Sequence, residues 1–295
     1  MDAIPGEKVA VATSLRVPEV RVAGGRASDD LRALWVVWKR ELIRFRRNRM
    51  RIVTSLAQPA IFLFVLGTGL STVIPTADHF NFRTFMFPGV LGMTVLFTSI
   101  FSAISIVWDR EFGFLREMLV APVHRWTLVL GKCLGGATVA TIQGTIMLAL
   151  AGLVGVPYDP VMLLVLLAEM TLTAFALTAF GVMVAARISD VQSFQVVTQL
   201  LVLPMFFLSG AVFPVTKLPA WLGILSKIDP LSYAVDPLRK EVFTYLSIPV
   251  ALRHTFDPGV SWGSWTLPVS VEVGLVALAA AVMLGVAIRQ FSRPI

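Results

Sequence analysis

Hydrophobic runs long enough to cross a bilayer recur along the chain, separated by shorter polar segments. A transmembrane helix needs about 20 mostly apolar residues. Six stretches meet this requirement: residues 52–74, 84–107, 133–156, 161–186, 191–216 and 269–288. Only Glu169 in the fourth run and Glu272 in the sixth interrupt them with charge. The pattern predicts an all-α polytopic membrane protein with six transmembrane helices over residues 52–295.

A further apolar stretch, residues 214–246, is divided by prolines. Proline ends or kinks a helix, and Pro214, Pro219, Pro230 and Pro237 leave pieces too short to cross a membrane. We therefore expect a pair of short re-entrant helices at the outer boundary of the membrane. A seventh crossing is the alternative reading of this stretch.

The first fifty residues are hydrophilic and fall into two parts. Residues 1–27 lack periodicity, which predicts a flexible cytoplasmic tail. Residues 28–51 begin with the capping residues Ser28, Asp29 and Asp30. Apolar side chains then recur at helical spacing, at Leu31, Leu34, Trp35, Trp38, Leu42 and Phe45, with Arg32, Lys39, Arg40, Arg44 and Arg47 outside that arc. This pattern predicts an amphipathic helix in the membrane surface, which either only anchors the chain or also docks on a cytoplasmic partner.

Composition excludes a soluble protein, and charge sets the orientation. The chain is 56% hydrophobic and 15% charged, whereas about 25% of residues are charged in soluble domains. Of the 25 lysines and arginines, 19 fall before the first run, in 108–132, at Arg187 or in the tail. Because the basic side stays in the cytoplasm, both termini are expected there, and the net charge of +7 needs no nucleic acid. One cysteine and three scattered histidines predict no disulfide and no metal site.

The segment 109–122 has the pattern of a short helix that docks on a protein. Phe112, Leu115 and Leu119 form one apolar row, and Pro122 ends the helix. Mixed charges accompany the row at Arg110, Glu111, Arg116 and Glu117. An apolar row with flanking charge suits a groove on a partner. A surface helix lying under the bundle is the alternative.

Two sequence blocks resemble those of ABC transporter permeases of the type-2 export family. The first is the acidic-basic segment ending at Pro122, followed by Leu130-Gly131-Lys132. The second runs from Phe-Leu-Ser-Gly-Ala-Val-Phe-Pro at 207–214, through Leu-Pro-Ala-Trp-Leu at 218–222, to the segment 229–239 that ends in Arg239. That family includes drug, antibiotic, polysaccharide and lipid-linked glycan exporters. The resemblance covers residue 31 to the C-terminus.

The resemblance implies roles for several segments. It makes 28–51 the connecting helix, with Trp35, Trp38, Arg40, Arg44 and Arg47. It makes 109–122 the coupling helix that contacts a separate ATPase subunit, through Arg110, Glu111, Phe112, Leu115, Arg116, Glu117, Leu119 and Pro122. It gives the outer gate as Leu208, Ser209, Gly210, Pro219, Trp221, Pro230, Tyr233 and Arg239. The implied location is a bacterial inner or plasma membrane.

The chain itself lacks the phosphate-binding loop of an ATPase. Lys132 is followed by Cys133 rather than Ser or Thr, and Trp126 stands where the first glycine of that loop belongs. The chain is therefore expected to be a transport subunit without enzymatic activity that binds no cofactor, with ATP and magnesium on two copies of the partner ATPase. The resemblance also implies a second permease copy or a sister permease, surrounded by membrane lipids.

Polar residues within the apolar runs are candidates for the translocation path. Gln192, Gln195 and Gln199 share one helical face. Glu169 lies at a depth where a carboxylate costs about 2.5–3.5 kcal/mol; helix packing is the alternative role. Apolar runs with few sugar-stacking aromatics favour outward movement of a hydrophobic drug-like or lipid-like substrate. A polysaccharide or lipid-linked glycan permease, a proton-driven secondary transporter and a membrane enzyme remain alternatives.

Overall fold

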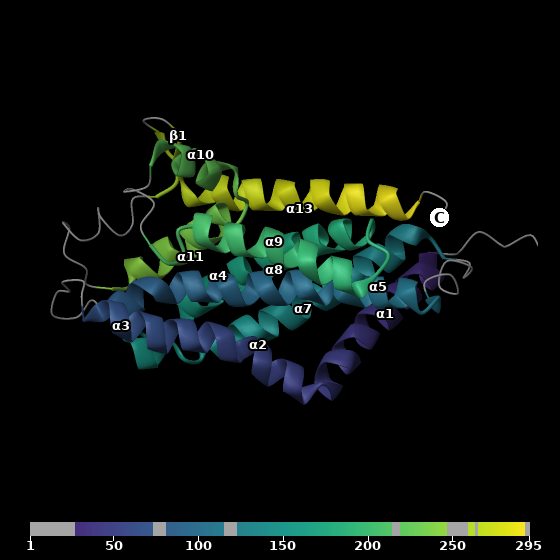
Figure 1. Ribbon diagram of the computed structural model, residues 1–295, viewed down its shortest axis with the longest axis horizontal. Coiled ribbons are helices and arrows are strands. Elements are labelled where there is room, and N and C mark those ends of the chain that lie inside the picture. Colours follow the sequence, from purple (N-terminus) through teal and green to yellow (C-terminus); the bar gives the residue numbers. More distant parts are fainter. Residues whose placement is uncertain are drawn as a thin grey trace, which may run out of the picture.

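A computed structural model describes residues 27–72, 81–114, 123–213, 219–246, 259–262 and 265–292. Long helices run side by side in a bundle, with shorter helices gathered at one end (Figure 1). The long helices are α4 (Phe82–Ser102), α7 (Arg125–Leu148), α8 (Pro160–Ala185), α9 (Val191–Leu208) and α13 (Val269–Phe291), and the shorter α5 (Ile104–Glu111) continues α4 in one apolar stretch. The short ones are η2 (Ala151–Val154), α10 (Ala220–Ile228) and α11 (Ser232–Thr244), beside the strands β1 (Ser261–Trp262) and β2 (Trp265–Thr266).

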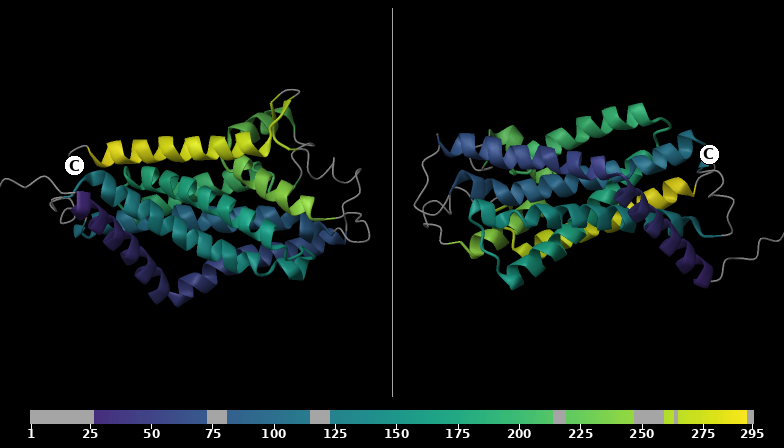
Figure 2. Two further views of the ribbon diagram at one scale, coloured as in Figure 1. Left: turned by 180° about the vertical axis from the view of Figure 1, so that it is seen from behind. Right: turned by 90° about the horizontal axis from the view of Figure 1, so that it is seen from below.

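The N-terminal part of the described chain forms a bent pair of helices. Helix α1 (Ala27–Arg47) ends at Asn48, and α2 (Arg49–Ile61) continues through the π-helical turn η1 (Phe62–Leu66) into α3 (Gly67–Ser71). Figure 2 shows that α1 crosses the end of the bundle obliquely and meets α2 in a V. The predicted amphipathic helix and first apolar run are thus separate helices that meet near Asn48.

Five stretches of helix are long and apolar enough to cross a membrane: Ile52–Ser71, Phe82–Glu111, Pro160–Ala185, Val191–Leu208 and Val269–Phe291. The prediction of an all-α polytopic membrane protein is confirmed. Helix α7 has the length but is less apolar, because Lys132, Gln143 and several glycines and threonines lie within it. Its neighbours α1, α4 and α8 cover much of its surface, so α7 does not need the composition of a helix surrounded by lipid.

Several helix ends differ from the predicted runs. The second apolar helix continues to Glu111, so it includes the start of the predicted coupling helix. Helix α7 starts at Arg125 rather than 133, because Lys132 has anionic partners within the bundle. Helix α9 stops at Leu208 rather than 216, because Gly210 adopts a positive φ of 74° that continues no right-handed helix.

The short helices α10 and α11 agree with the expectation that 214–246 contains pieces too short to span a membrane. They have 9 and 13 residues, and Pro237 lies inside α11. Residues 214–218 lie outside the described part of the chain.

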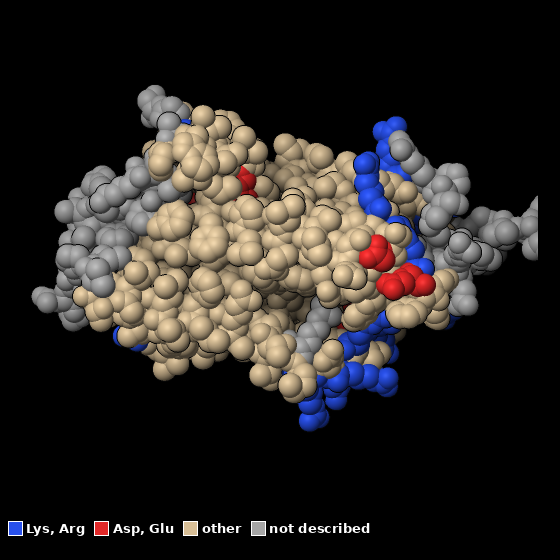
Figure 3. Space-filling view, viewed as in Figure 1, with Lys and Arg blue, Asp and Glu red and all other residues tan. Residues whose placement is uncertain are grey.

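The two ends of the bundle differ in charge. The start of α1, the end of α5 and the end of α13 lie at one end, and α3, α10 and the strands lie at the other (Figure 1). Lysine and arginine gather at the former, which we call the basic end (Figure 3). We call the other the far end. The loops that the sequence grouped by charge thus lie together in the fold.

Candidate coupling site and central cavity

A cluster of buried charges joins three segments at the basic end. We call Arg40 and Glu41 of α1, Asp109 of α5 and Lys132 of α7 the ion cluster. Lys132 Nζ lies 2.7 Å from Glu41 Oε1 and 2.8 Å from Asp109 Oδ2, and it donates to Ser105 Oγ at 2.9 Å. Arg40 Nη2 lies 2.7 Å from Asp109 Oδ2. These two cations, with Arg44 at 3.6 Å from Asp109 Oδ1, thus surround two carboxylates across three helices.

Burial makes this arrangement specific. Lys132, Glu41 and Asp109 expose 6%, 8% and 5% of their side chains. A buried charge is tolerated only when it is paired and hydrogen-bonded. Since each partner comes from a different helix, the pairing is complete only when α1, α5 and α7 hold one relative position. The ion cluster therefore fixes the geometry of the segments that flank the predicted coupling helix.

Two glycines let α1 approach α7 closely enough for these contacts. A Cβ atom at Gly131 would lie 2.9 Å from Val37 Cβ, and one at Gly135 would lie 2.7 Å from Glu41 Cβ. Both distances are shorter than real side-chain contacts allow. Small residues four apart are a common means of close packing between helices in membranes.

A second contact between α1 and α7 lies near the start of both helices. Asp30 Oδ1 accepts the backbone N–H of His124 at 3.1 Å, and Asp30 Oδ2 lies 2.7 Å from His124 Nδ1. These bonds, the backbone one foremost, hold the pKa of Asp30 below its ordinary value. Asp30 was expected to cap the start of its own helix; instead its carboxylate lies at the N-terminus of α7, where the helix dipole favours negative charge.

The face of α1 that packs against the protein differs from the apolar stripe that the sequence predicted to lie in the membrane surface. Its buried residues are Asp30, Val37 and Glu41, whereas Leu31 and Trp35 are exposed by 66% and 52%. The difference arises because α1 packs on a protein surface that offers cations and small residues. Its other apolar side chains stay available to lipid or a partner.

The remaining connecting-helix candidates divide between the two faces of α1. Trp38 Nε1 donates to Thr138 Oγ1 of α7 at 3.1 Å, and Arg44 Nη2 lies 3.6 Å from Asp109 Oδ1. Lys39 Nζ lies 4.5 Å from the centre of the exposed Trp35 ring. Arg47 is exposed. Arg40 and Arg44 therefore act within the protein, and Arg47 faces its surroundings.

Two of the predicted coupling residues bind the chain itself. Arg110 donates to the carbonyl oxygens of Ile188 and Ala186, each at 2.8 Å, and Glu111 Oε2 accepts the N–H of Val191 at 3.1 Å. They attach the end of α5 to the turn between α8 and α9.

The next residues point outward. Phe112 and Phe114 are exposed by 79% and 51%, and both line a surface groove beside Arg40, Arg44, Trp108 and Asp109. The other coupling candidates lie outside the described residues: Leu115, Arg116, Glu117, Leu119 and Pro122.

A cavity of about 360 Å³ lies near the bend between α1 and α2 and is open to the surface, because its lining residues Thr54, Gln58 and Gln195 are exposed. Aromatic side chains line it at Phe45, Phe97, Phe101 and Trp108, and neutral polar ones at Thr54, Ser55, Gln58, Thr98, Gln143 and Gln195. Gln143 bonds to Thr98 on one side and donates to Ser55 Oγ on the other. We call it the central cavity. The described residues that line it carry no ionisable group.

The structure separates the residues predicted for the translocation path. Gln195 lines the central cavity. Gln192 and Gln199 are exposed on the same helix but are not among its lining residues. Glu169 of α8 also lies outside it, and interacts electrostatically with Glu241 of α11.

Half of the predicted outer-gate residues form one buried junction at the far end. Ser209 Oγ donates to the carbonyl of Phe206 at 2.8 Å, and Ser232 Oγ lies 3.5 Å from the carbonyl of Leu208. Arg239, 2% exposed, donates to the carbonyl of Gly210. The junction joins the end of α9 to α11.

The other gate residues lie elsewhere. Pro230 and Tyr233 line a separate apolar cavity, whereas Pro219 and Trp221 are exposed. A second buried ion pair lies near that cavity: Lys240 Nζ of α11 is 2.7 Å from Asp236 Oδ2 and 2.9 Å from Glu272 Oε1 of α13. Glu272, the one acid of the sixth apolar run, is fully buried.

Of the residues in the ion cluster, only Arg40 was predicted from sequence. The hydrophobic pattern placed Lys132 in the loop before the third apolar run and gave Glu41 and Asp109 no role. The available signal was a single lysine within a stretch that is otherwise uncharged from 128 to 148. A cation there requires an anionic partner, and Asp109 is the acid that follows the second apolar run.

Comparisons with known proteins agree with this architecture. Nodulation protein J of Rhizobium meliloti (strain 1021) is 30% identical over 209 residues, covering 70% of this chain and 79% of that protein. Putative transport permease ycf38 of Cyanophora paradoxa is 28% identical over 214 residues, 71% of this chain and 73% of that one. Probable multidrug ABC transporter permease YbhR of Escherichia coli (strain K12) is 28% identical over 167 residues, 56% of this chain and 45% of that one. The family description of ABC-2 type transporters matches residues 32–243, which include the ion cluster and the central cavity. The chain therefore belongs to the ABC-2 type transporter family.

Proposed function

We propose that this chain is the membrane-spanning permease subunit of an ATP-driven exporter that moves a hydrophobic drug-like or lipid-like substrate outward by alternating access. The central cavity is the observation that carries this proposal. Its volume of about 360 Å³ lies in the range of drug-sized sites, about 300–1,000 Å³. Aromatic and neutral polar walls suit an uncharged amphiphilic molecule. The similarity to a probable multidrug permease supports the same substrate class.

Six crossings follow if α7 spans the membrane together with the five more apolar stretches. The start of α1 and the end of α13 lie at the same end of the bundle (Figure 1), and only an even number of crossings returns the chain to the side from which it started. Lysine and arginine at that end (Figure 3) favour the cytoplasm for the basic end and for both termini. The membrane is then the inner or plasma membrane of a bacterium, and the far end is its outer face.

Energy enters from a separate ATPase chain, present in two copies, which holds the ATP and magnesium. Phe112 and Phe114, exposed beside the ion cluster, offer the apolar contact for that partner. A push on this segment acts directly on α5, and the ion cluster passes it to α1 and α7. Arg110 and Glu111 pass it to the turn before α9. The helices that line the central cavity thus move together.

Two alternatives have distinct consequences. A polysaccharide or lipid-linked glycan permease would use the four aromatic side chains of the central cavity to stack sugars; the sequence argument from scarce aromatics does not hold for this cavity. A proton-driven transporter would work without an ATPase partner. It would rest on Glu169, which lies outside the cavity.

The proposal is tested by reconstituting the chain with its ATPase in vesicles and measuring ATP hydrolysis with drugs, lipids and lipid-linked glycans. We expect stimulation by amphiphilic drugs or lipids. Stimulation by glycans alone would reject the substrate class, and substrate movement by the chain alone would reject the ATP-driven mechanism.

A matched pair of variants connects the stimulation to the cavity. Gln195→Leu removes a lining amide, and we expect half-maximal stimulation at a several-fold higher drug concentration. Gln192→Leu makes the same change one helical turn away and outside the cavity, so the concentration should stay near that of the unaltered protein. Equal behaviour of the two variants would argue that the substrate binds elsewhere.

A further inference from the structure

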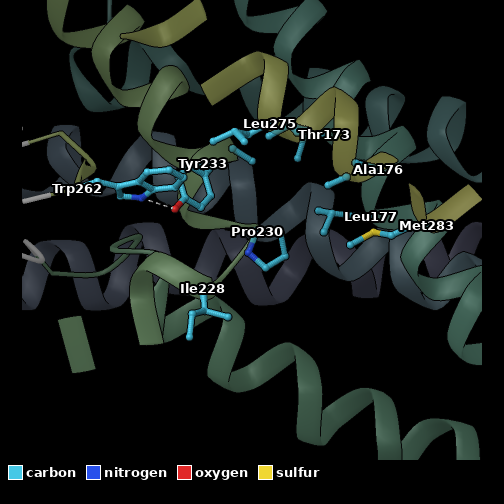
Figure 4. Close-up of a pocket in the computed structure, with 12 residues that line it drawn as sticks. Thr173, Ala176, Leu177, Ile228, Pro230, Tyr233, Trp262, Leu275 and Met283 are labelled. Carbon is cyan, nitrogen blue, oxygen red and sulfur yellow. Dashed lines mark hydrogen bonds between the residues drawn. The ribbon is translucent and has the colours of Figure 1, made fainter. Parts of the chain in front are cut away.

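A second cavity lies toward the far end and shares no lining residue with the central cavity. Its volume is about 210 Å³. Helices α8 and α13 form two of its walls, and the turn between α10 and α11 and the side chain of Trp262 close it near the far end (Figure 4). Its lining is almost wholly apolar and includes Leu177, Val276, Ala279 and Met283.

The polar groups at the mouth already have partners. Tyr233 Oη donates to the carbonyl of Lys227 at 2.6 Å and accepts from Trp262 Nε1 at 3.0 Å (Figure 4). A polar ligand would have to break these bonds, whereas a hydrocarbon leaves them intact. The chemistry of the cavity therefore selects the apolar part of a ligand.

Size narrows the choice further. A dry apolar cavity of about 150 Å³ holds a molecule as small as benzene, whereas drug-sized ligands occupy about 300–1,000 Å³. At about 210 Å³, this cavity fits a segment of a hydrocarbon chain. It lies between two membrane-crossing stretches, α8 and α13, so the surrounding medium consists of such chains.

Next in sequence to the lining residue Ile228, Lys227 supplies charge of the sign that binds a phosphate. Lys227 is exposed, and its own carbonyl receives the Tyr233 hydroxyl. Beside it, Trp221, Ile224 and Ile228 expose the apolar face of α10, and tryptophan is typical of the headgroup level. A phosphate above the mouth and an acyl chain below it would match this order of groups.

We propose that this cavity binds one acyl chain of a membrane phospholipid whose phosphate pairs with Lys227. The bound lipid fills the space between α8, α13 and the short helices, and it holds the far end together independently of the transported substrate. This site lies apart from the central cavity and does not depend on the proposed export function.

The test uses the full chain in vesicles of phosphatidylethanolamine and phosphatidylglycerol. A small fraction of the phosphatidylethanolamine carries a diazirine near the end of one acyl chain. After illumination, mass spectrometry locates the labelled peptides. We expect labels on the α8 and α13 residues that line the cavity, in clear excess over Leu278 and Val282, which face away from the protein and are 61% and 57% exposed.

Two alanines on α13 provide a matched pair. Ala279→Phe fills the cavity and should lower labelling of its walls several-fold. Ala277→Phe adds the same ring at an exposed position outside it and should leave labelling unchanged. Labelling spread evenly over the exposed face of α13, with no difference between the two variants, would overturn the proposal. Lys227→Gln should lower the labelling yield as well; an unchanged yield would overturn the phosphate contact.

Discussion

A lysine buried in a membrane bundle needs negative charge close by, and Lys132 has it from Glu41 and Asp109. Lys132→Met would leave both carboxylates buried without this cation. Breaking such a pair costs about 3–5 kcal/mol. We expect a large fall in the temperature of thermal unfolding in detergent or nanodiscs. Adding Glu41→Gln and Asp109→Asn should restore much of the stability, because no buried carboxylate is then left without its cation and Arg40, 30% exposed, keeps access to water.

The control for this change is on α1, the helix that supplies Glu41 to the ion cluster. Lys39 is exposed over the Trp35 ring, and a contact of that kind contributes at most about 1 kcal/mol. The Lys39→Met protein should therefore have an unfolding temperature within a few degrees of that of the unaltered protein. Equal unfolding temperatures for the two lysine variants would show that the ion cluster contributes little to stability.

The carboxyl group of Asp229, at the far end, should make the stability of the folded protein depend on pH. Burial raises its pKa to about 7, although its bond from the N–H of Leu231 at 3.0 Å opposes this. The folded protein then holds a proton that the unfolded chain releases above its ordinary pKa of 3.8. Stability therefore falls as pH rises from about 4 to about 7 and stays reduced above that range.

Asp229→Asn should remove this pH-dependent loss. The amide oxygen can still accept the Leu231 N–H, and each unit of pKa difference corresponds to about 1.4 kcal/mol. We expect unfolding temperatures close to those of the unaltered protein near pH 4, and a value several degrees higher for the variant at pH 8. A variant that is less stable at pH 8 would contradict the assignment of a buried, protonated Asp229.

Individual charges were the least predictable part of the site. Gln195 could be assigned to a cavity from its polar side chain on an apolar helix. Glu41 and Asp30 look like ordinary exposed acids of an amphipathic helix, because the cations and N–H groups that attract them come from α7, some 90 residues later. Such pairings depend on tertiary contacts that no local pattern contains.

At the scale of elements, the approach of α1 to α7 is the contact that the site depends on most. A methyl group at Gly135 would lie 2.7 Å from Glu41 Cβ and 2.9 Å from its Cγ. Gly135→Ala should push α1 away and cost about 1–3 kcal/mol, as overpacking does. Hydrogen exchange measured by mass spectrometry should be faster across Ala27–Arg47 than in the unaltered protein.

Gly274 on α13 is the matched control, because a methyl group there would meet no atom within 4 Å. Gly274→Ala should stabilise its helix by about 0.5–1 kcal/mol and leave the exchange of α1 unchanged. Slow exchange of α1 in the Gly135→Ala protein would mean that the two helices do not need their close contact.

The hydrophobic pattern of the sequence predicted the long helices, but it did not predict the residues at which they begin and end. The apolar runs correspond to helices because a helix satisfies its backbone hydrogen bonds within itself, as a bilayer without water requires. The boundaries shifted where a residue had a partner elsewhere. Helix α7 extends back past Lys132, and α5 continues to Glu111, which bonds to the start of α9. Helix α9 ended early at Gly210, a signal already visible in the Ser-Gly pair.

At the scale of the whole molecule, one face of α9 is left uncovered by the described residues of a single chain. Gln192, Gln195 and Gln199 are exposed there together with Val196 and Leu200. Lipid tails cannot satisfy exposed amides, so we expect a second copy of the chain to cover this face around a two-fold axis. A residue near such an axis lies close to the same residue of its partner.

Cysteine cross-linking in membranes tests this arrangement. Cys133 is buried in the bundle, and Cys133→Ala supplies a background without other thiols. Leu200→Cys, at a position 72% exposed, should form a disulfide-linked dimer under mild oxidation. Val282→Cys on α13, 57% exposed, should stay monomeric because that face meets lipid. A sister permease in place of a second copy would leave Leu200→Cys monomeric too, whereas a dimer through position 282 alone would transfer the interface to α13.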